Sequence, residues 1–192
     1  MRRQRFNPID RALRWWRARS VLRLVAPGAR VLDVGCGSEN WLVRSAAGIA
    51  ADSLGIDPDL EPEFVDDRGR RATIDDVAAA EPEAFDAATS LAVIEHLPVD
   101  SVSAHLAAIQ RALRPGGRLV LTTPTPRSQP LLEFLAFRVH VISEHEIRDH
   151  RHYYTRDELV ALFGEDDWHV EYRTFQFGFN QHVVATRRGG HA

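Results

Sequence analysis

The chain has 192 residues, of which 44% are hydrophobic and 27% charged, the profile of a globular protein with one domain and a sizeable core. The formal net charge of −3 gives no indication of a nucleic-acid partner, and we expect none. No apolar run reaches the ~18 residues of a membrane span, and the N-terminus lacks the apolar core of a signal peptide. The one cysteine cannot form an internal disulfide, which favours a reducing, cytoplasmic compartment.

The N-terminal segment has the pattern of a helix over residues 8–25. Asn7 can cap it, Pro8 suits its first turn, and apolar side chains recur along one stripe, with most arginines away from that stripe. A basic helix of this kind can lie on a membrane surface or attract an anionic substrate. We favour a lid helix, residues 1–25, that packs its apolar stripe beside a ligand cleft and leaves its arginines in water.

The rest of the chain alternates strands with helices. In chain order we expect a strand at 30–34, a helix at 41–50, strands at 53–57, 70–75 and 85–91, a helix at 101–113, a strand at 118–124, a helix at 157–163 capped by Thr155, and strands at 168–176 and 181–187. This alternation indicates one α/β domain, residues 1–192, with a doubly wound parallel sheet. The last two strands have only a tight connection and must pair antiparallel.

The stretch "VLDVGCGSEN" (31–40) runs from a strand into a glycine turn. Gly35 and Gly37 carry no side chain, so the backbone there can approach a ligand closely. A doubly wound sheet binds its ligand beyond the carboxyl ends of its strands, where the strand order reverses. Asp57 ends the second strand 22 positions after Gly35, near the ~20 of a nucleoside-binding unit, and a carboxylate offers two acceptor oxygens to a ribose.

Asp33 lies inside an otherwise apolar strand. A carboxylate there is costly unless something binds it, so Asp33 favours a ligand site over a tight turn with no ligand. A nicotinamide-dependent oxidoreductase would also use a glycine turn and a distal acid. That alternative is disfavoured because Glu39 replaces the third glycine of its fingerprint and the chain has no lysine for a Ser/Tyr/Lys catalytic set.

Four stretches, in this order and spacing, resemble class I S-adenosylmethionine (SAM)-dependent methyltransferases: "VLDVGCG", "GIDPD", "FDAATSLAVIEHLP" and "LRPGGRLVLTTPTP". They are most similar to the small-molecule branch that includes the ubiquinone-pathway O-methyltransferases. The resemblance covers about residues 25–187. It implies a Rossmann-like, doubly wound, seven-stranded sheet, mostly parallel with an antiparallel last strand, and methyl transfer from SAM to a small metabolite, which we expect at a hydroxyl oxygen.

The same resemblance implies a set of cofactor-binding residues. The residues around the glycine turn would surround the methionine part of SAM, Asp57 would hold its ribose, and an acidic pair in "TIDDV" would lie near the adenine amino group. Two residues after the fourth strand would line the pocket near the sulfonium. The full set is Asp33, Gly35, Cys36, Gly37, Asp57, Pro58, Asp75, Asp76, Leu91 and Ala92.

Glu39 stands where the family has a third glycine. Facing the ligand, its carboxylate would repel the methionine carboxylate of SAM, which would weaken or abolish the site. We favour a Glu39 side chain that points to solvent, because Asp33, Gly35, Gly37 and Asp57 are all intact. The alternative is a non-catalytic binding protein that retains the methyltransferase fold.

A hydroxyl acceptor must lose a proton, and histidine is the natural base at neutral pH. Histidines are dense in residues 140–154, within a segment, 127–154, that we expect on the acceptor side of the site. The candidate bases are His150, His152 and His96, with His150 preferred because it leads into a capped helix. The alternative is a solvated surface segment. The histidine spacing matches no standard zinc arrangement, so we expect no metal.

Overall fold

The computed structural model describes residues 15, 26–45, 52–138 and 149–189. The expected helix at 8–25 therefore lies outside the described residues except for Trp15, and so do residues 46–50 of the helix predicted at 41–50. The lid role of residues 1–25, the acceptor-side role of residues 127–154 and the single-domain organisation stay predictions.

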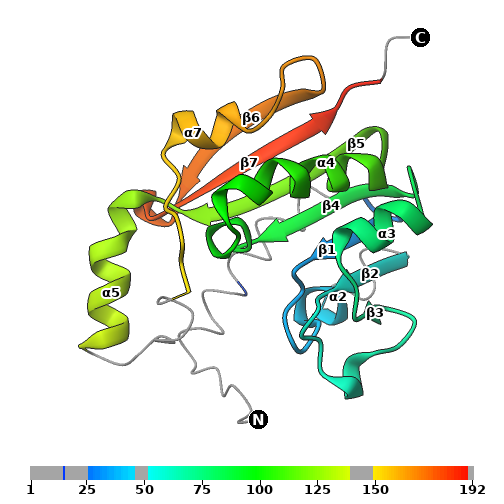
Figure 1. Ribbon diagram of the computed structural model, residues 1–192, viewed down its shortest axis with the longest axis horizontal. Coiled ribbons are helices and arrows are strands. Elements are labelled where there is room, and N and C mark those ends of the chain that lie inside the picture. Colours follow the sequence, from blue (N-terminus) through cyan, green and yellow to red (C-terminus); the bar gives the residue numbers. More distant parts are fainter. Residues whose placement is uncertain (1–14, 16–25, 46–51, 139–148, 190–192) are drawn as a thin grey trace.

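One mixed sheet of seven strands, in the order β3-β2-β1-β4-β5-β7-β6, forms the centre of the protein (Figure 1). Neighbouring strands from β3 to β5 pair in parallel, and β7 pairs antiparallel with both β5 and β6. This confirms the predicted doubly wound sheet and its antiparallel last strand. The strands are β1 (Arg30–Val34), β2 (Asp52–Ile56), β3 (Gly69–Arg70), β4 (Phe85–Leu91), β5 (Leu113–Pro124), β6 (Trp168–Phe175) and β7 (Asn180–Arg187).

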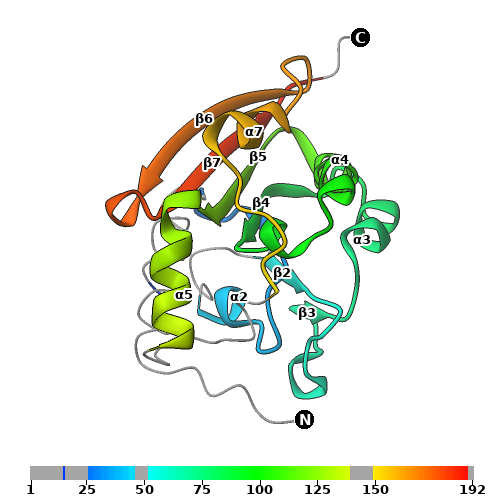
Figure 2. The same ribbon diagram turned by 60° about the vertical axis from the view of Figure 1, so that its left-hand side comes forward.

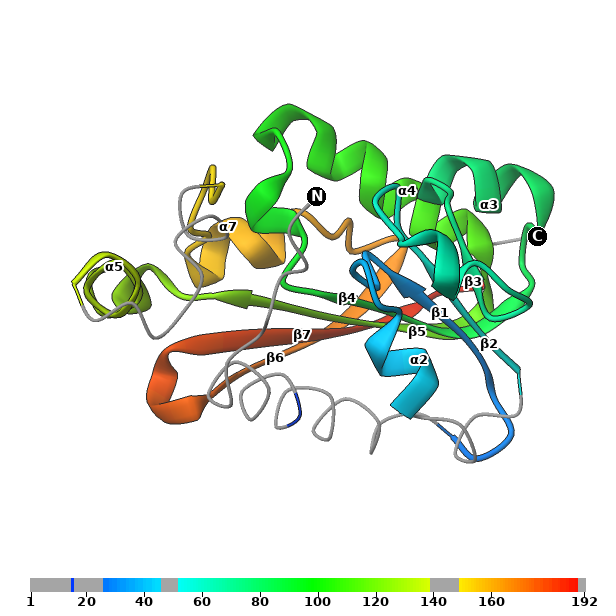
Figure 3. The same cartoon turned by 90° about the horizontal axis from the view of Figure 1, so that it is seen from below.

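Helices cover the sheet on both faces. Seen edge-on, α3, α4 and α7 lie on one face of the sheet and α2 on the other (Figure 3), while α5 stands beyond the end of β5 (Figure 1). The main core lies between the sheet and α3, α4 and α7, where alternate strand residues meet apolar helix residues. None of the described helices is long and apolar enough to cross a membrane. The helices are α2 (Trp41–Ser45), α3 (Ile74–Ala80), α4 (Val102–Ala112), α5 (Gln129–Phe137) and α7 (Arg156–Ala161).

The predicted third strand at 70–75 is wrong over most of its length. Only Gly69–Arg70 pairs with β2, and the chain enters α3 at Ile74. Thr73 caps that helix, because its hydroxyl accepts from the Asp76 amide while the Asp76 carboxylate accepts from the Thr73 amide. This capping box stabilises a helix start, and it outweighs the β-like composition of "RRATID".

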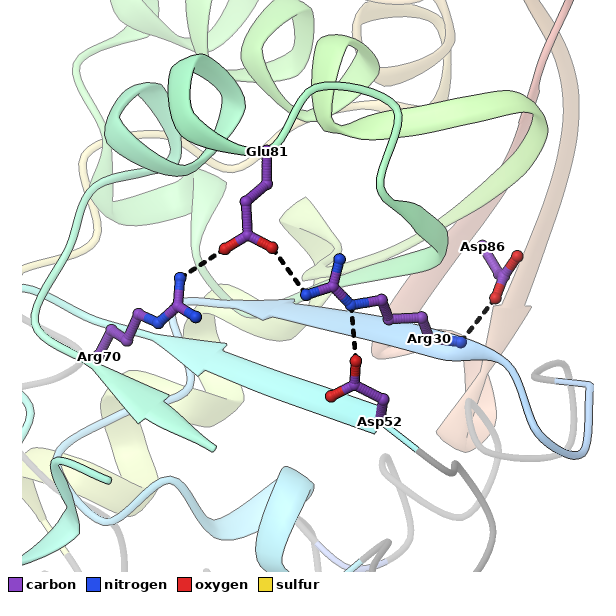
Figure 4. A network of polar contacts seen from close by, with 5 residues as sticks. All are labelled: Arg30, Asp52, Arg70, Glu81 and Asp86. Carbon is purple, nitrogen blue, oxygen red and sulfur yellow. Dashed lines mark hydrogen bonds and ion pairs between the residues drawn. The ribbon is translucent and has the colours of Figure 1, made fainter. Parts of the chain in front are cut away.

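A polar network joins the amino ends of three strands to the end of α3 (Figure 4). Arg30 at the start of β1 bonds Asp52 on β2 at 2.8 Å and Glu81 after α3 at 2.7 Å, while its backbone amide donates to Asp86 on β4. Arg70 of β3 bonds the second oxygen of Glu81. Arg30, Asp52 and Asp86 lie at or near the amino ends of β1, β2 and β4, away from the carboxyl ends. Arg70 reaches Glu81 from the other end of its strand, where it pairs with Ile56, the last residue of β2.

Glu81→Gln is expected to lower the free energy of unfolding by about 1–2 kcal/mol, because two charge-assisted bonds, to Arg30 and Arg70, are lost from a partly buried position. The matched control is Asp75→Asn, whose exposed bond to Arg111 should cost less than about 0.5 kcal/mol. Urea denaturation of each variant at neutral pH gives both values.

The Glu81 effect should depend on pH. The bond from Arg70, with that from Arg30, lowers the pKa of Glu81 against the cost of burial. A carboxylate with a lowered folded pKa stabilises the protein above its unfolded pKa, and this stabilisation is lost as the pH falls through the folded pKa. The wild type and Glu81→Gln should therefore converge in acid. A difference that grows on acidification would contradict the network's role.

Candidate active site

The glycine turn lies where the strand order reverses, because β1 has β2 on one side and β4 on the other. The amides of Gly35 and Cys36 donate to the carbonyl of Ile56 at 2.9 and 3.1 Å, which ties the turn to the end of β2. Gly35 has φ +75°, and a Cβ there would lie 2.5 Å from Cγ2 of Val93 after β4. The ends of β1, β2 and β4 are thus packed together, and only glycine fits at position 35.

Space opens at the second glycine of the turn. Gly37 also has a positive φ, +73°, yet a Cβ added there would meet no described atom within 4 Å. Its amide donates to Oδ2 of Asp57 at 3.0 Å, and the Asp59 amide donates to Oδ1 of Asp57 at 2.8 Å. The Asp57 carboxylate is therefore fixed beside the turn at the end of β2, with the exposed Pro58 following it. Each of its oxygens has a further lone pair for a ligand hydroxyl.

Asp33 is a buried carboxylate next to this turn, with 3% of its surface exposed. The Thr89 hydroxyl of β4 donates to its Oδ1 at 2.6 Å. Burial raises the pKa of Asp33 to about 7, the Thr89 bond lowers it, and the negative charge of Asp57 raises it further. The two carboxylates give the site a negative potential that suits a cationic ligand. Cys36 is buried, and burial raises the pKa of its thiol, so it stays neutral at physiological pH.

Asn40 positions the turn, and the sequence interpretation overlooked it. It is fully buried with φ +47°, and its Nδ2 donates to the Arg68 carbonyl at 2.8 Å. A Cβ at Gly55 of β2 would lie 2.0 Å from Oδ1 of Asn40, so the amide fits over a strand glycine. Gly55, a glycine inside a short strand, was the sequence signal that could have indicated the close approach of another group at this point. The neighbouring Glu39 is exposed, in agreement with a side chain that faces solvent.

The predicted adenine-side acids both have partners within the protein. Asp75 bonds Arg111 of α4 at 3.0 Å, and Asp76 belongs to the capping box, where the Thr73 amide lowers the pKa of its carboxyl. Their adenine role stays a prediction. Leu91 ends β4, and Ala92 follows with φ +60° and an amide that donates to the Thr122 carbonyl at 2.9 Å.

Two of the three candidate bases lie together. His96 ends the short helical turn Ile94–His96 after β4, and its ring centroid lies 4.8 Å from that of His150, edge to face. His150 in turn is 2.8 Å, through Nδ1, from the hydroxyl of Tyr153. His152 lies apart from this pair: its Nε2 is 3.5 Å from Oε1 of Glu158 on α7.

Glu95 joins the two segments that carry this pair. The chain before α7 runs beside the loop after β4 (Figure 2), and the Arg151 amide donates to the Glu95 carbonyl at 2.7 Å. The Glu95 side chain is fully buried and accepts from the Thr123 hydroxyl of β5 at 3.0 Å. Glu95 therefore ties the backbone next to His96 to the backbone next to His150.

A carboxylate and two imidazoles also form a set that could bind a metal ion. The ligand atoms of Glu95, His96 and His150 all lie within 4.8 Å of one another. This set escaped the sequence interpretation, which weighed only the spacing within the histidine-bearing segment and not its approach to the loop after β4. The expectation of no metal stays a prediction.

A family profile described as a methyltransferase domain matches residues 1–172. The chain belongs to this family. The ubiquinone biosynthesis O-methyltransferase of Hahella chejuensis is 36% identical over 140 residues, 59% of this chain and 58% of that protein. A protein of the same name from Xanthomonas campestris is 37% identical over 113 residues, 53% of this chain and 45% of that protein. This methyltransferase chain spans about half the length of these curated relatives.

Solved structures confirm the fold of the methyltransferase. A SAM-dependent methyltransferase from Archaeoglobus fulgidus is 15% identical with a TM-score of 0.74, over 92% of this chain and 94% of that one. The 1,6-didemethyltoxoflavin-N1-methyltransferase of Burkholderia thailandensis, solved with S-adenosylhomocysteine, is 18% identical with a TM-score of 0.62, over 89% of this chain and 76% of that one. The chain therefore has the fold of SAM-dependent methyltransferases.

Proposed function

We propose that the protein transfers the methyl group of SAM to a hydroxyl oxygen of a small molecule. The observation that carries the proposal is the pair of carboxylates, Asp33 and Asp57, beside an open glycine turn at the switch point of the sheet. SAM has a cationic ammonium and sulfonium and a ribose diol, so it complements this pair. The hydroxyl acceptor is supported by the relatives named O-methyltransferases.

The residues of this chain have two tasks in such a reaction. SAM supplies an activated methyl group, and the protein aligns it with the acceptor in line with the leaving sulfur, which can contribute several kcal/mol through proximity. The second task is removal of the acceptor's proton. His150 and His96, on the segments that meet at Glu95, are the groups for that task.

We also infer a cytoplasmic location and a small-molecule partner rather than a nucleic acid. The location rests on the single cysteine, Cys36, which is buried and free. The partner rests on the net charge of −3, which gives no sign of a nucleic-acid surface.

Asp57→Ala is expected to weaken SAM binding by about 1–3 kcal/mol, because hydrogen bonds from the ribose to a charged acceptor are lost. Calorimetry with SAM measures this, and the matched control is Asp59→Ala, an exposed neighbour with which SAM affinity should be unchanged. Calorimetry with NADH tests the oxidoreductase alternative. Binding of NADH but not of SAM would reject the proposed function, and unchanged SAM affinity in Asp57→Ala would remove that residue from the ribose role.

A further inference from the structure

We propose that the outer edge of β6 is a self-association surface, on which two copies of this chain pair antiparallel about a two-fold axis at Tyr172. β6 is the last strand in the order of the sheet and lies on the outside of the protein (Figure 2). Pairing through β6 would join two seven-stranded sheets into one continuous sheet. The inference concerns an edge of the sheet and does not depend on the reaction proposed above.

The outer edge of β6 has no strand beside it in the described part of the chain. On its inner side, β7 pairs with every residue of β6. Among the described residues, no backbone hydrogen bond outside the sheet involves residues 169–174. A strand that is paired on one side only directs alternate N–H and C=O groups away from the sheet. These groups form a template to which a further strand can add.

Most of the devices that protect a sheet edge are missing from β6. Such edges are usually blunted by a short strand, a proline, a bulge or charged side chains. β6 has eight residues, contains no proline, and pairs with β7 without a break in register. Charge is the remaining device, so the positions of the charged side chains decide what this edge can accept.

Glu171 and Arg173 carry the carboxylate and the guanidinium of β6, one on each side of Tyr172. They point to the same face of the sheet because they are two positions apart, and both are exposed. In a two-fold antiparallel pair centred on Tyr172, Glu171 of each copy lies opposite Arg173 of the other. The strand is therefore complementary in charge to a second copy of itself.

The charges also disfavour the neighbouring two-fold registers. If the axis moves by one residue, either Glu171 or Arg173 lies opposite its own copy. Like charges directly opposite each other destabilise a pair of strands. Exposed ion pairs contribute little energy, so the backbone hydrogen bonds would supply most of the affinity and the charges would select the register.

The uncharged positions of β6 fit the same register. Val170 lies opposite Thr174, which brings two β-branched residues together on each side of the axis. His169 lies opposite Phe175 on the face that carries the charges, so an imidazole meets an aromatic ring. Tyr172 lies opposite its own copy at the axis. Aromatic and β-branched residues in opposed positions stabilise neighbouring strands.

Sedimentation velocity tests the proposal, with the wild type between about 5 and 500 μM, and we expect a dimer at the upper end of this range. Glu171→Arg and Arg173→Glu each place like charges opposite one another, so each should raise the dimer dissociation constant about tenfold or more. The two substitutions change the net charge in opposite directions, so net charge alone cannot explain a loss in both. A monomeric wild type, or a dimer that neither substitution weakens, would overturn the proposal.

The two variants are complementary to each other, which gives a stricter test. Glu171→Arg has arginine at both positions and Arg173→Glu has glutamate at both, so their equimolar mixture should form a heterodimer. The double variant Glu171→Arg/Arg173→Glu exchanges the two charges within one chain and should recover the dimer of the wild type. Failure of either combination to recover a dimer would show that the substitutions damage the strand, and would overturn the proposed register.

Glu165→Arg is the matched control for reversal of an exposed charge. Glu165 is exposed and lies between α7 and β6, outside the proposed register. The dimer dissociation constant of this variant should be that of the wild type. A loss of dimer equal to that in Glu171→Arg would mean that no specific pair at β6 is involved, and would overturn the proposal.

Discussion

His150→Gln is expected to lower turnover by about 10²–10⁴-fold while SAM affinity stays nearly intact. The loss follows because the acceptor's hydroxyl proton would have no positioned base, whereas His150 lies outside the carboxylate and glycine cluster proposed to bind SAM. Glutamine keeps a polar group near Tyr153 but cannot take a proton at neutral pH. S-adenosylhomocysteine release measures the effect, at a saturating concentration of a hydroxyl compound that the wild type methylates.

The control for this experiment is His152→Gln, because His152 belongs to the same segment but its Nε2 faces Glu158 on α7. We expect its turnover to fall less than about threefold, because the exposed pair of His152 with Glu158 contributes little energy. A histidine that only positions the acceptor would raise KM and leave kcat unchanged. Full turnover of the His150, His152 and His96 variants between about pH 6 and 9 would mean that no histidine acts as base.

The sheet was predictable because its strands are short apolar runs bounded by glycine, proline and polar residues. The parallel sheet and the antiparallel pairing of β6 with β7 follow from these boundaries and from the connection lengths, whereas the order of the strands in the sheet comes from the structure. The prediction failed at residues 70–75, where a capping box formed by Thr73 and Asp76 competes with β propensity. Local hydrogen bonding decided the outcome there, and composition alone did not show it.

The candidate site also has a part that could be predicted from the sequence and a part that could not. The glycine turn and Asp57 could be found because they follow one strand each at a fixed spacing, and the structure brings them within a hydrogen bond of each other. The approach of His96 to His150 could not be found, since it depends on a backbone contact between Glu95 and Arg151, 56 residues later in the chain than Glu95. Long-range contacts of this kind leave no periodic signal in the sequence.

Asp33→Asn is expected to weaken SAM binding by about 100-fold or more. In Asp33→Asn the cationic group of bound SAM would lose its buried carboxylate partner. Leaving one charge of a buried ion pair uncompensated typically costs about 3 kcal/mol or more. The substitution is conservative in shape, because an asparagine Oδ1 can still accept from the Thr89 hydroxyl at the position where Asp33 does. Calorimetry at about pH 8 measures the loss. In the wild type, SAM affinity should fall as the pH drops below about 7, where Asp33 takes up a proton.

The same variant is expected to make the ligand-free protein more stable at about pH 8, by roughly 2–4 kcal/mol. Burial raises the pKa of Asp33 from 3.8 to about 7. A carboxyl with a raised folded pKa stabilises the fold fully below its unfolded pKa, and this contribution is lost as the pH rises through the folded pKa. The ionised, buried Asp33 therefore opposes folding at pH 8, and the asparagine removes that cost.

Urea denaturation without SAM, at about pH 8 and pH 5, measures this second effect, and the gain should shrink at the lower pH because Asp33 is then largely protonated in the folded state. Asp57→Asn is the control: its carboxylate is only partly buried, so the variant should lose SAM affinity without gaining stability. A gain in stability combined with a loss of SAM affinity would identify Asp33 as a charge retained for its ligand at a cost to the fold. An Asp33→Asn variant less stable than the wild type at pH 8 would show that the carboxylate serves the fold instead.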